Sequence, residues 1–196
     1  MLSETELKIL SSFFPEGKEI TLKIIQKRSK LSYEPVHRIL KQLAGKKLLF
    51  EKKFGKTLVY NLEFDKEEHK LAFYHYMTER VIAFSKKHNK VFRAIKELER
   101  ELFDIIILFG SYSKGTETKN SDVDLMIVTD EKNKENEVYG LKHVYNLNFA
   151  PAFVKKQEFP KIKKENNILW KSLKNFSIVF KGIDLYYYWM YKNESN

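Results

Sequence analysis

The chain has 196 residues, 43% of them hydrophobic and 14% aromatic, which is enough apolar side chain to build the cores of two small domains. It contains no cysteine, which excludes a disulfide scaffold, thiolate zinc sites and cysteine nucleophiles, and fits a reducing compartment. The formal net charge of +10 points to a polyanionic partner. Neither a signal peptide nor an apolar run of roughly 18 residues is visible, so we expect a soluble, cytoplasmic protein with no membrane partner.

The excess positive charge is concentrated in residues 21–60, which hold 11 Lys and Arg against 2 Glu. Such a concentration is typical of a surface that binds nucleic acid. The alternative is a lysine-rich surface that only maintains solubility, as is common in heat-adapted proteins. Charge alone does not separate these two interpretations.

Residues 1–64 have the pattern of three helices followed by a β-hairpin. A helix over 4–14 and a short helix from Thr21 precede a third helix with Ser32 as its expected N-cap. In that third helix the apolar residues at helical spacing are Val36, Ile39, Leu40 and Leu43. Two strand-like runs then meet at Gly55, which allows a tight turn.

This segment resembles the winged helix-turn-helix domains of prokaryotic regulators, through its third helix and the lysines of its hairpin. The resemblance implies a recognition helix in the major groove of double-stranded DNA, positioned by phosphate contacts. The residues expected to face DNA are Lys27, Arg28, Tyr33, His37, Arg38, Lys41, Gln42, Lys52, Lys53 and Lys56. The alternative is a module that only dimerises or binds a protein partner.

Residues 65–87 carry apolar side chains at spacings of three and four, which predicts a connector helix. These side chains are Tyr74, Met77, Val81 and Phe84. We favour packing of this stripe against a neighbouring domain; a coiled-coil seam with a second copy, and hence a homodimer, is the alternative. A further amphipathic helix is expected from Val91, Ile95, Leu98 and Leu102.

The most informative segment begins with an unbroken apolar run over 105–109, which predicts a strand buried on both faces. Gly110 lets the backbone after this strand approach a ligand closely, and the following amides and the Ser111 hydroxyl suit phosphate oxygens. Asp122 and Asp124 flank one apolar residue, so strand alternation places both carboxylates on one face, about 7 Å apart. This all-oxygen donor set predicts Mg²⁺. The alternative, a turn cap and an ordinary strand-edge residue, is disfavoured by the Gly-Ser pair.

Residues 108–128 resemble the nucleotidyltransferase superfamily that includes DNA polymerase β, and most closely its minimal nucleotidyltransferases, through the spacing Gly-Ser-x10-Asp-x-Asp. The resemblance implies a mixed sheet backed by helices and transfer of a nucleoside monophosphate from an NTP, with release of pyrophosphate. Carried onto this sequence, it implies a nucleotide site at Gly110, Ser111, Lys114 and Ser121, and two Mg²⁺ ions bound by Asp122 and Asp124.

One departure from that family concerns a third carboxylate on a later strand, which completes the metal site and acts as a base. The expected strand here is 144–151, and it offers Asn146 or Asn148 instead of an acid. An amide can ligate a metal but takes no proton. Either another acid serves or catalysis is weak or lost. The other acids considered for this role are Asp130, Glu131 and Glu158.

We therefore expect an α+β chain with a winged helix-turn-helix domain at 1–64, a connector helix at 65–87 and a minimal nucleotidyltransferase domain at 88–196. A helix, a short strand ending at Gly182 and an aromatic segment at 186–189 close the chain. We interpret the aromatic segment as core or interface, with base stacking as the less favoured role.

Two functions remain open from the sequence. The preferred one is an enzyme that transfers a nucleotide, with AMP from ATP as the expected donor, to a protein or nucleic-acid hydroxyl. The resemblance adds a concrete setting, an antitoxin that modifies a HEPN-type toxin. The other is a DNA-binding regulator whose degenerate catalytic domain senses NTP. Asp122 and Asp124 favour the enzyme, whereas Asn148 favours the regulator.

Overall fold

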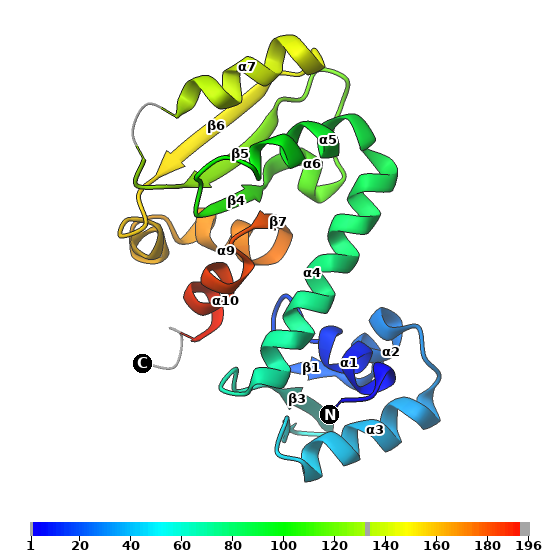
Figure 1. Cartoon of the computed structure of the whole chain (residues 1–196). Coiled ribbons are helices and arrows are strands. Elements are labelled where there is room, and N and C mark those ends of the chain that lie inside the picture. The colour runs from blue at the N-terminus through cyan, green and yellow to red at the C-terminus, as the bar shows by residue number, and fades with distance from the viewer. Residues whose placement is uncertain (1, 132–133, 193–196) are drawn as a thin grey trace. The chain divides into compact units, whose positions relative to one another are not determined.

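The computed structural model describes residues 2–131 and 134–192, which form two compact units (Figure 1). Unit 1 ends at Thr78 and unit 2 begins at Glu79. Both residues belong to the long helix α4 (Glu67–Lys87). The segment expected to be a separate connector is therefore divided between the two units.

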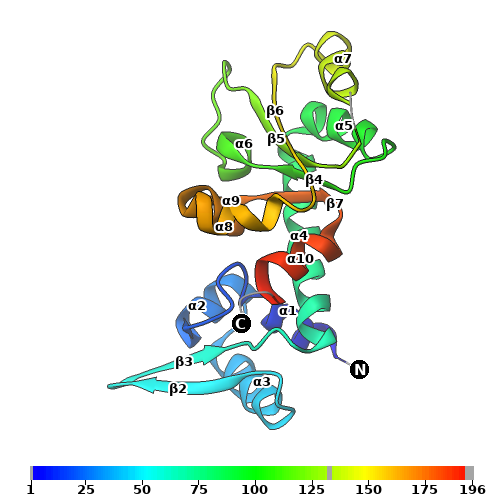
Figure 2. The ribbon, with the colours of Figure 1, turned by 90° about the vertical axis from the view of Figure 1, so that its left-hand side faces the viewer.

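Unit 1 contains the three helices and the hairpin that the sequence predicts, and one short strand that it does not. Its elements before α4 are α1 (Glu4–Ser11), β1 (Ile20–Thr21), α2 (Leu22–Ser29), α3 (Tyr33–Gly45), β2 (Phe50–Phe54) and β3 (Thr57–Asn61). The sheet order is β1-β3-β2, with both pairs antiparallel. Figure 2 shows the β2–β3 hairpin extending away from the helices of this unit.

The core of unit 1 follows from the apolar stripe of α3. Val36, Leu40 and Leu43 are fully buried and Ile39 nearly so, because α3 packs against α1 and α2. Full burial of such a side chain stabilises the fold by about 1.5–3 kcal/mol. The helix α1 begins with a capping box between Ser3 and Glu6.

Unit 2 is a mixed sheet with helices on both sides. After α4 come α5 (Asn89–Leu98), β4 (Ile105–Leu108), α6 (Gly110–Lys114), β5 (Val123–Val128), α7 (Glu135–Tyr145), β6 (Phe149–Val154), η1 (Phe159–Lys161), α8 (Ile162–Glu165), α9 (Asn167–Phe176), β7 (Ile178–Lys181) and α10 (Ile183–Tyr191). The strand order is β6-β5-β4-β7, and only the β5–β6 pair of these is parallel. Figure 2 shows α5 and α7 on one side of the sheet, with α8 and α9 on the other. The α+β class expected from the sequence is confirmed.

The central strand β4 is the most buried part of this sheet, since all four of its residues are fully inaccessible. Two strands flank it and helices cover both of its faces, which explains an apolar run without alternation. Because β4 and β5 are antiparallel, with Leu108 opposite Leu125, the end of β4 lies beside the start of β5. This pairing positions the site described below.

Several boundaries differ from the sequence analysis, among them the end of the first helix, which was expected at residue 14 and lies at Ser11. Val144 and Tyr145 were assigned to a strand, but they close helix α7, and β6 begins only at Phe149. The strand propensity of these two residues is overridden by the helix whose buried face carries Val138 and Leu141. Leu102, expected on the inner face of a helix, lies beyond the end of α5 and is 72% exposed.

The aromatic segment near the C-terminus is the helix α10. Tyr186 and Tyr187 are 1% exposed, so the interpretation as core is confirmed for these two, whereas Tyr188 is 49% exposed. The hydroxyl of Tyr186 donates to the carbonyl of Leu173 over 2.9 Å, which satisfies it inside the core. In the described ranges, no helix combines the length and the apolar character needed to cross a membrane.

Candidate active site

The turn after β4 fits closely against Asp124. Gly110 has a φ of +68°, in the left-handed region that favours glycine. A Cβ atom added to it would lie 1.9 Å from Oδ2 of Asp124. The amide of Phe109 also donates to the backbone carbonyl of Asp124 over 3.0 Å. Two independent constraints, conformation and space, therefore require glycine at position 110.

Residues 110–114 form one helical turn, an element that the sequence analysis did not assign. The helix α6 ends at Gly115, whose φ of +74° closes the turn. The hydroxyl of Ser113 donates to the carbonyl of Gly110 over 3.0 Å. Five residues give no readable periodicity, so no sequence signal pointed to this helix.

Asp124 is half-buried and Asp122 is exposed, as expected at the start of a strand whose intervening residue Val123 is buried. Burial raises the pKa of the Asp124 carboxyl, and the negative charge of Asp122 raises it further. A backbone hydrogen bond from Ser111 and the charge of Lys114 act in the opposite direction. The turn, the acidic pair and this lysine are therefore close enough to influence one another.

These two carboxylates are a suitable but incomplete donor set for a divalent cation. Over residues 2–131 and 134–192, no group of three or more His, Cys, Asp or Glu side chains is arranged to hold a metal. Mg²⁺ commonly binds through one or two carboxylates and completes its shell with substrate phosphates and water. The raised pKa of Asp124 marks a carboxylate whose charge a bound cation would stabilise.

The strand β6 runs parallel to β5 and brings no acid to this pair. Ala150 lies level with Asp124. Asn148 precedes β6, and its carbonyl accepts a hydrogen bond of 2.8 Å from the amide of Val123. Asn146 is not on the strand at all, because it ends α7 with a left-handed φ of 44°. Of the two asparagines named as substitutes for the third carboxylate, only Asn148 is placed beside the acidic pair.

The other acids considered for this role lie at the wrong end of the sheet. Asp130, Glu131 and Glu158 line a pocket of about 690 Å³ that follows the C-terminal end of β5. The strand from Asp124 to Val128, where β5 ends, spans about 13 Å, and Asp130 follows beyond that end. These acids therefore cannot complete the site.

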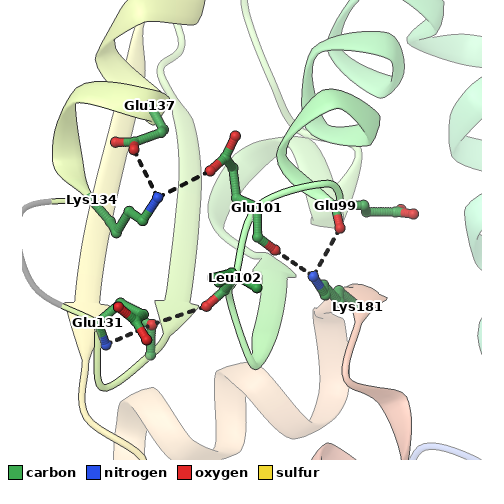
Figure 3. Close-up of polar contacts among 8 residues, drawn as sticks. Glu99, Glu101, Leu102, Glu131, Lys134, Glu137 and Lys181 are labelled. Atoms are coloured by element: carbon green, nitrogen blue, oxygen red, sulfur yellow. Dashed lines mark hydrogen bonds and ion pairs between the residues drawn. The ribbon is translucent and has the colours of Figure 1, made fainter.

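A separate network of ion pairs and hydrogen bonds braces this same end of the sheet (Figure 3). The Nζ atom of Lys134 lies 3.2 Å from Glu101 and 3.0 Å from Glu137. The ammonium of Lys181 donates to the backbone carbonyls of Glu99 and Glu101 and so holds the chain that follows α5. These contacts are structural and remote from the acidic pair.

Lys114 and Ser121, the other two residues expected to contact the nucleotide, differ from each other in their surroundings. Lys114 is exposed, with its Nζ 5.4 Å from the centre of the Phe176 ring. The hydroxyl of Ser121 instead accepts a hydrogen bond of 2.9 Å from the amide of Thr118. Lys114 is therefore available to a ligand, whereas Ser121 braces the loop that leads into β5.

Comparison with known proteins adds one finding to this geometry. The family model of the nucleotidyltransferase domain matches residues 88–185, which include the turn after β4 and the acidic pair. The chain belongs to the nucleotidyltransferase domain family. Neither the curated proteins nor the solved structures gave a match. Nucleotidyl transfer is accordingly the general activity of this domain, and the turn and acidic pair lie inside it.

The second group of predicted site residues lies in unit 1, outside the matched nucleotidyltransferase domain. Tyr33 is 51% exposed and stacks on His37, with ring centres 5.4 Å apart. Besides Tyr33, the exposed members of the set are Lys27, Arg28, Arg38, Lys41, Gln42, Lys52, Lys53 and Lys56. At the hairpin, Lys52 lies 4.7 Å from the centre of the exposed Phe54 ring, a residue that the sequence analysis did not single out.

Arg28 was expected in this set and has another role. Its guanidinium forms a two-point pair with Glu16, with both contacts at 2.7 Å. It also donates to the carbonyls of Ser12 and Phe14. These bonds tie α2 to the chain that follows α1, so we remove Arg28 from the residues expected to face DNA.

Proposed function

We propose that the protein is a Mg²⁺-dependent nucleotidyltransferase that moves a nucleoside monophosphate, with AMP from ATP as the expected donor, to an acceptor on a protein or nucleic acid. The observation that carries this proposal is the fit between Gly110 and Asp124, where a single added carbon would lie 1.9 Å from the carboxylate. A phosphate-binding turn held this close to an acidic pair is what nucleotide transfer requires. Membership of the nucleotidyltransferase family supports the same reaction class.

Each residue of the proposed site has a defined task. Asp122 and Asp124 would hold Mg²⁺, which neutralises charge on the transferred phosphate and activates the acceptor. The backbone of Ser111 hydrogen-bonds the Asp124 carboxylate, and the Ser111 hydroxyl would bind a phosphate oxygen. Lys114 supplies a positive charge near the same carboxylate. The chain thus contributes orientation and charge, which are the main protein contributions in phosphoryl-type transfer.

The test of this proposal uses ATP labelled at the α-phosphate with Mg²⁺ and a panel of acceptors, including the protein itself. We expect transfer of label and release of pyrophosphate from the wild type, and at least a hundredfold loss in the Asp122→Ala plus Asp124→Ala variant. Label transfer that persists in the double variant would refute the assigned site.

A second candidate function, binding of double-stranded DNA, is favoured by unit 1. We propose that unit 1 is a winged helix-turn-helix domain in which α3 reads the major groove and the β2–β3 hairpin contacts the backbone. The exposed Arg38 and Lys41 of α3 and the exposed lysines of the hairpin support this role. DNA binding is compatible with an antitoxin that modifies a HEPN-type toxin and regulates its own synthesis.

The alternative to the enzyme is a DNA-binding regulator that senses NTP without transferring it. Asn148 and Ala150 beside the acidic pair favour this alternative, because neither side chain takes a proton. Binding of Mg²⁺ and ATP without any release of pyrophosphate would support the regulator over the enzyme.

A further inference from the structure

A pocket of about 270 Å³ lies beside α6, the helical turn that begins at Gly110. Three cationic side chains line it, those of Arg80, Lys87 and Lys114. Of the described residues that line this pocket, none is acidic. The larger pocket at the opposite end of β5 contains several carboxylates instead. The pocket beside α6 is therefore suited to an anion.

The cations of this pocket differ in how firmly they are held. Arg80 donates to the carbonyls of Ser113 and Phe176, over 3.2 and 2.6 Å, and so fixes the wall of the pocket. Lys87 pairs with Glu117 over 2.8 Å but keeps 58% of its side chain exposed. Lys114 is exposed and lies near enough to Asp124 to affect the pKa of that carboxyl. Two exposed lysine side chains thus border the pocket, and the charge of one of them, Lys114, reaches Asp124.

Aromatic rings form the other part of the wall. His88 packs edge-to-face on Tyr112, with ring centres 5.3 Å apart. It also packs against Phe84, at 4.9 Å. Burial lowers the pKa of His88, and the charge of Glu117, whose Oε1 lies 3.4 Å from Nε2 of the imidazole, acts in the opposite direction. Flat rings beside cations form a surface that suits a base and its phosphate together.

The acidic pair places a chemical limit on the acceptor. A hydroxyl nucleophile must lose a proton as it attacks, and a side chain within hydrogen-bonding reach normally takes it. Here Ala150 is level with Asp124, and Asn148 precedes it. Asp130, Glu131 and Glu158 line a pocket beyond the far end of β5, a strand that spans about 13 Å from Asp124 to Val128. A phosphate monoester has a second pKa of about 6, so near pH 7 most of it is already a dianion and needs no base.

Building on the proposed function, we propose that the acceptor group is the 5′-phosphate of a nucleotide, bound in the pocket beside α6. A phosphate oxygen attacks the α-phosphorus of the NTP and forms a new phosphoanhydride bond. The bond between the α-phosphorus and the bridging oxygen breaks, and pyrophosphate leaves with the electron pair. The acceptor dianion loses no proton, so the step balances without a base.

The experiment compares acceptors that differ only in their phosphate, with α-labelled ATP and Mg²⁺. AMP is paired with adenosine as the free nucleotide, and a 5′-phosphorylated oligonucleotide is paired with its 5′-hydroxyl form as the chain end. We expect at least tenfold faster labelling of the phosphorylated member of a pair, with one pyrophosphate released for each label transferred. The pair that responds identifies the source of the phosphate. Equal or faster labelling of the hydroxyl forms would overturn this inference and leave the proposed transferase intact, whereas no pyrophosphate release with any acceptor would contradict both.

Variants of the pocket separate acceptor binding from donor binding. Lys87→Ala is expected to raise KM for the phosphorylated acceptor by about tenfold, with KM for ATP unchanged, because one charge-assisted contact is lost. Lys86→Ala removes the neighbouring exposed lysine, which does not line the pocket, and should change neither. A rise in KM for ATP alone would assign the pocket to the donor and refute the proposal.

Ala150→Asp supplies an acid beside Asp124, and it should increase labelling of adenosine relative to AMP.

Discussion

At the scale of single residues, the proposed site depends on Gly110 more than on any other position. Its φ of +68° and its contact with Asp124 are separate reasons for glycine. The sequence predicted a close backbone approach there, but to a ligand. In the structure the first group approached is the carboxylate itself, and this could not be read from spacing because it depends on how β4 and β5 pair.

Replacement of Gly110 by alanine is expected to lower the free energy of unfolding by about 1–3 kcal/mol, because φ is unfavourable and the added methyl displaces Asp124. Binding of MgATP should fall at least tenfold. Gly140 in α7 is a matched control, since a Cβ there would meet nothing within 4 Å. Gly140→Ala should stabilise the protein by about 0.5–1 kcal/mol. Chemical denaturation and calorimetry measure both quantities, and wild-type ATP binding by Gly110→Ala would contradict the proposed geometry.

The raised pKa of Asp124 predicts a pH-dependent effect of Mg²⁺. The folded protein retains this proton above the ordinary value of 3.8, where the unfolded chain has released it. Stability without metal therefore falls as pH rises from 3.8 through the raised pKa. Mg²⁺ binds the ionised form, so the increase in Tm on adding Mg²⁺ should be absent at low pH and complete above that pKa. Asp124→Asn should abolish this pH dependence, and a Tm increase that does not change with pH would count against Asp124 as a ligand.

At the scale of elements, the sequence predicted the helices and strands with a clear apolar pattern and missed the short ones, whose conformation depends on a few residues. The apolar stripe of α3 and the unbroken run of β4 gave correct elements because many residues share one pattern. The helix α6 and strand β1 are too short to show a period. The strand expected at 144–151 was wrong at its start. Val144 and Tyr145 have high β-propensity, but they lie in α7, a helix that is held by burial of Val138 and Leu141 on another face.

The basic elements of unit 1 lead to a prediction on DNA binding. Lys41→Ala in α3 and Lys52→Ala in the hairpin should each reduce the slope of log affinity against log salt by about 1, since each removes one phosphate contact. Arg28→Ala should leave the slope unchanged but destabilise unit 1 by about 1–2 kcal/mol, because its bonds are internal. Titration of a DNA duplex at several salt concentrations measures the slope. Affinity that does not depend on salt would remove the DNA-binding proposal.

At the scale of the whole molecule, the chain combines a positively charged unit 1 with a nucleotidyltransferase unit 2. The residues of the candidate active site all lie in unit 2, so the geometry of the sequence motif is defined within one compact unit. The pairing of β4 with β5 places the turn that begins at Gly110 against Asp124. The absence of an acid from the neighbouring strand was also read from the sequence, although the residue level with Asp124 is Ala150 rather than an asparagine.

The most direct test of the central claim is a calorimetric titration of MgATP into the full chain and into the Asp122→Ala plus Asp124→Ala variant, with Gly140→Ala as the folded control. We expect binding by the wild type and the control, and at least tenfold weaker binding by the double variant. We also expect removal of Mg²⁺ to weaken binding to the wild type but to have little further effect on the double variant. Undiminished, Mg²⁺-dependent binding by the double variant would contradict the assignment of this acidic pair as the metal and nucleotide site.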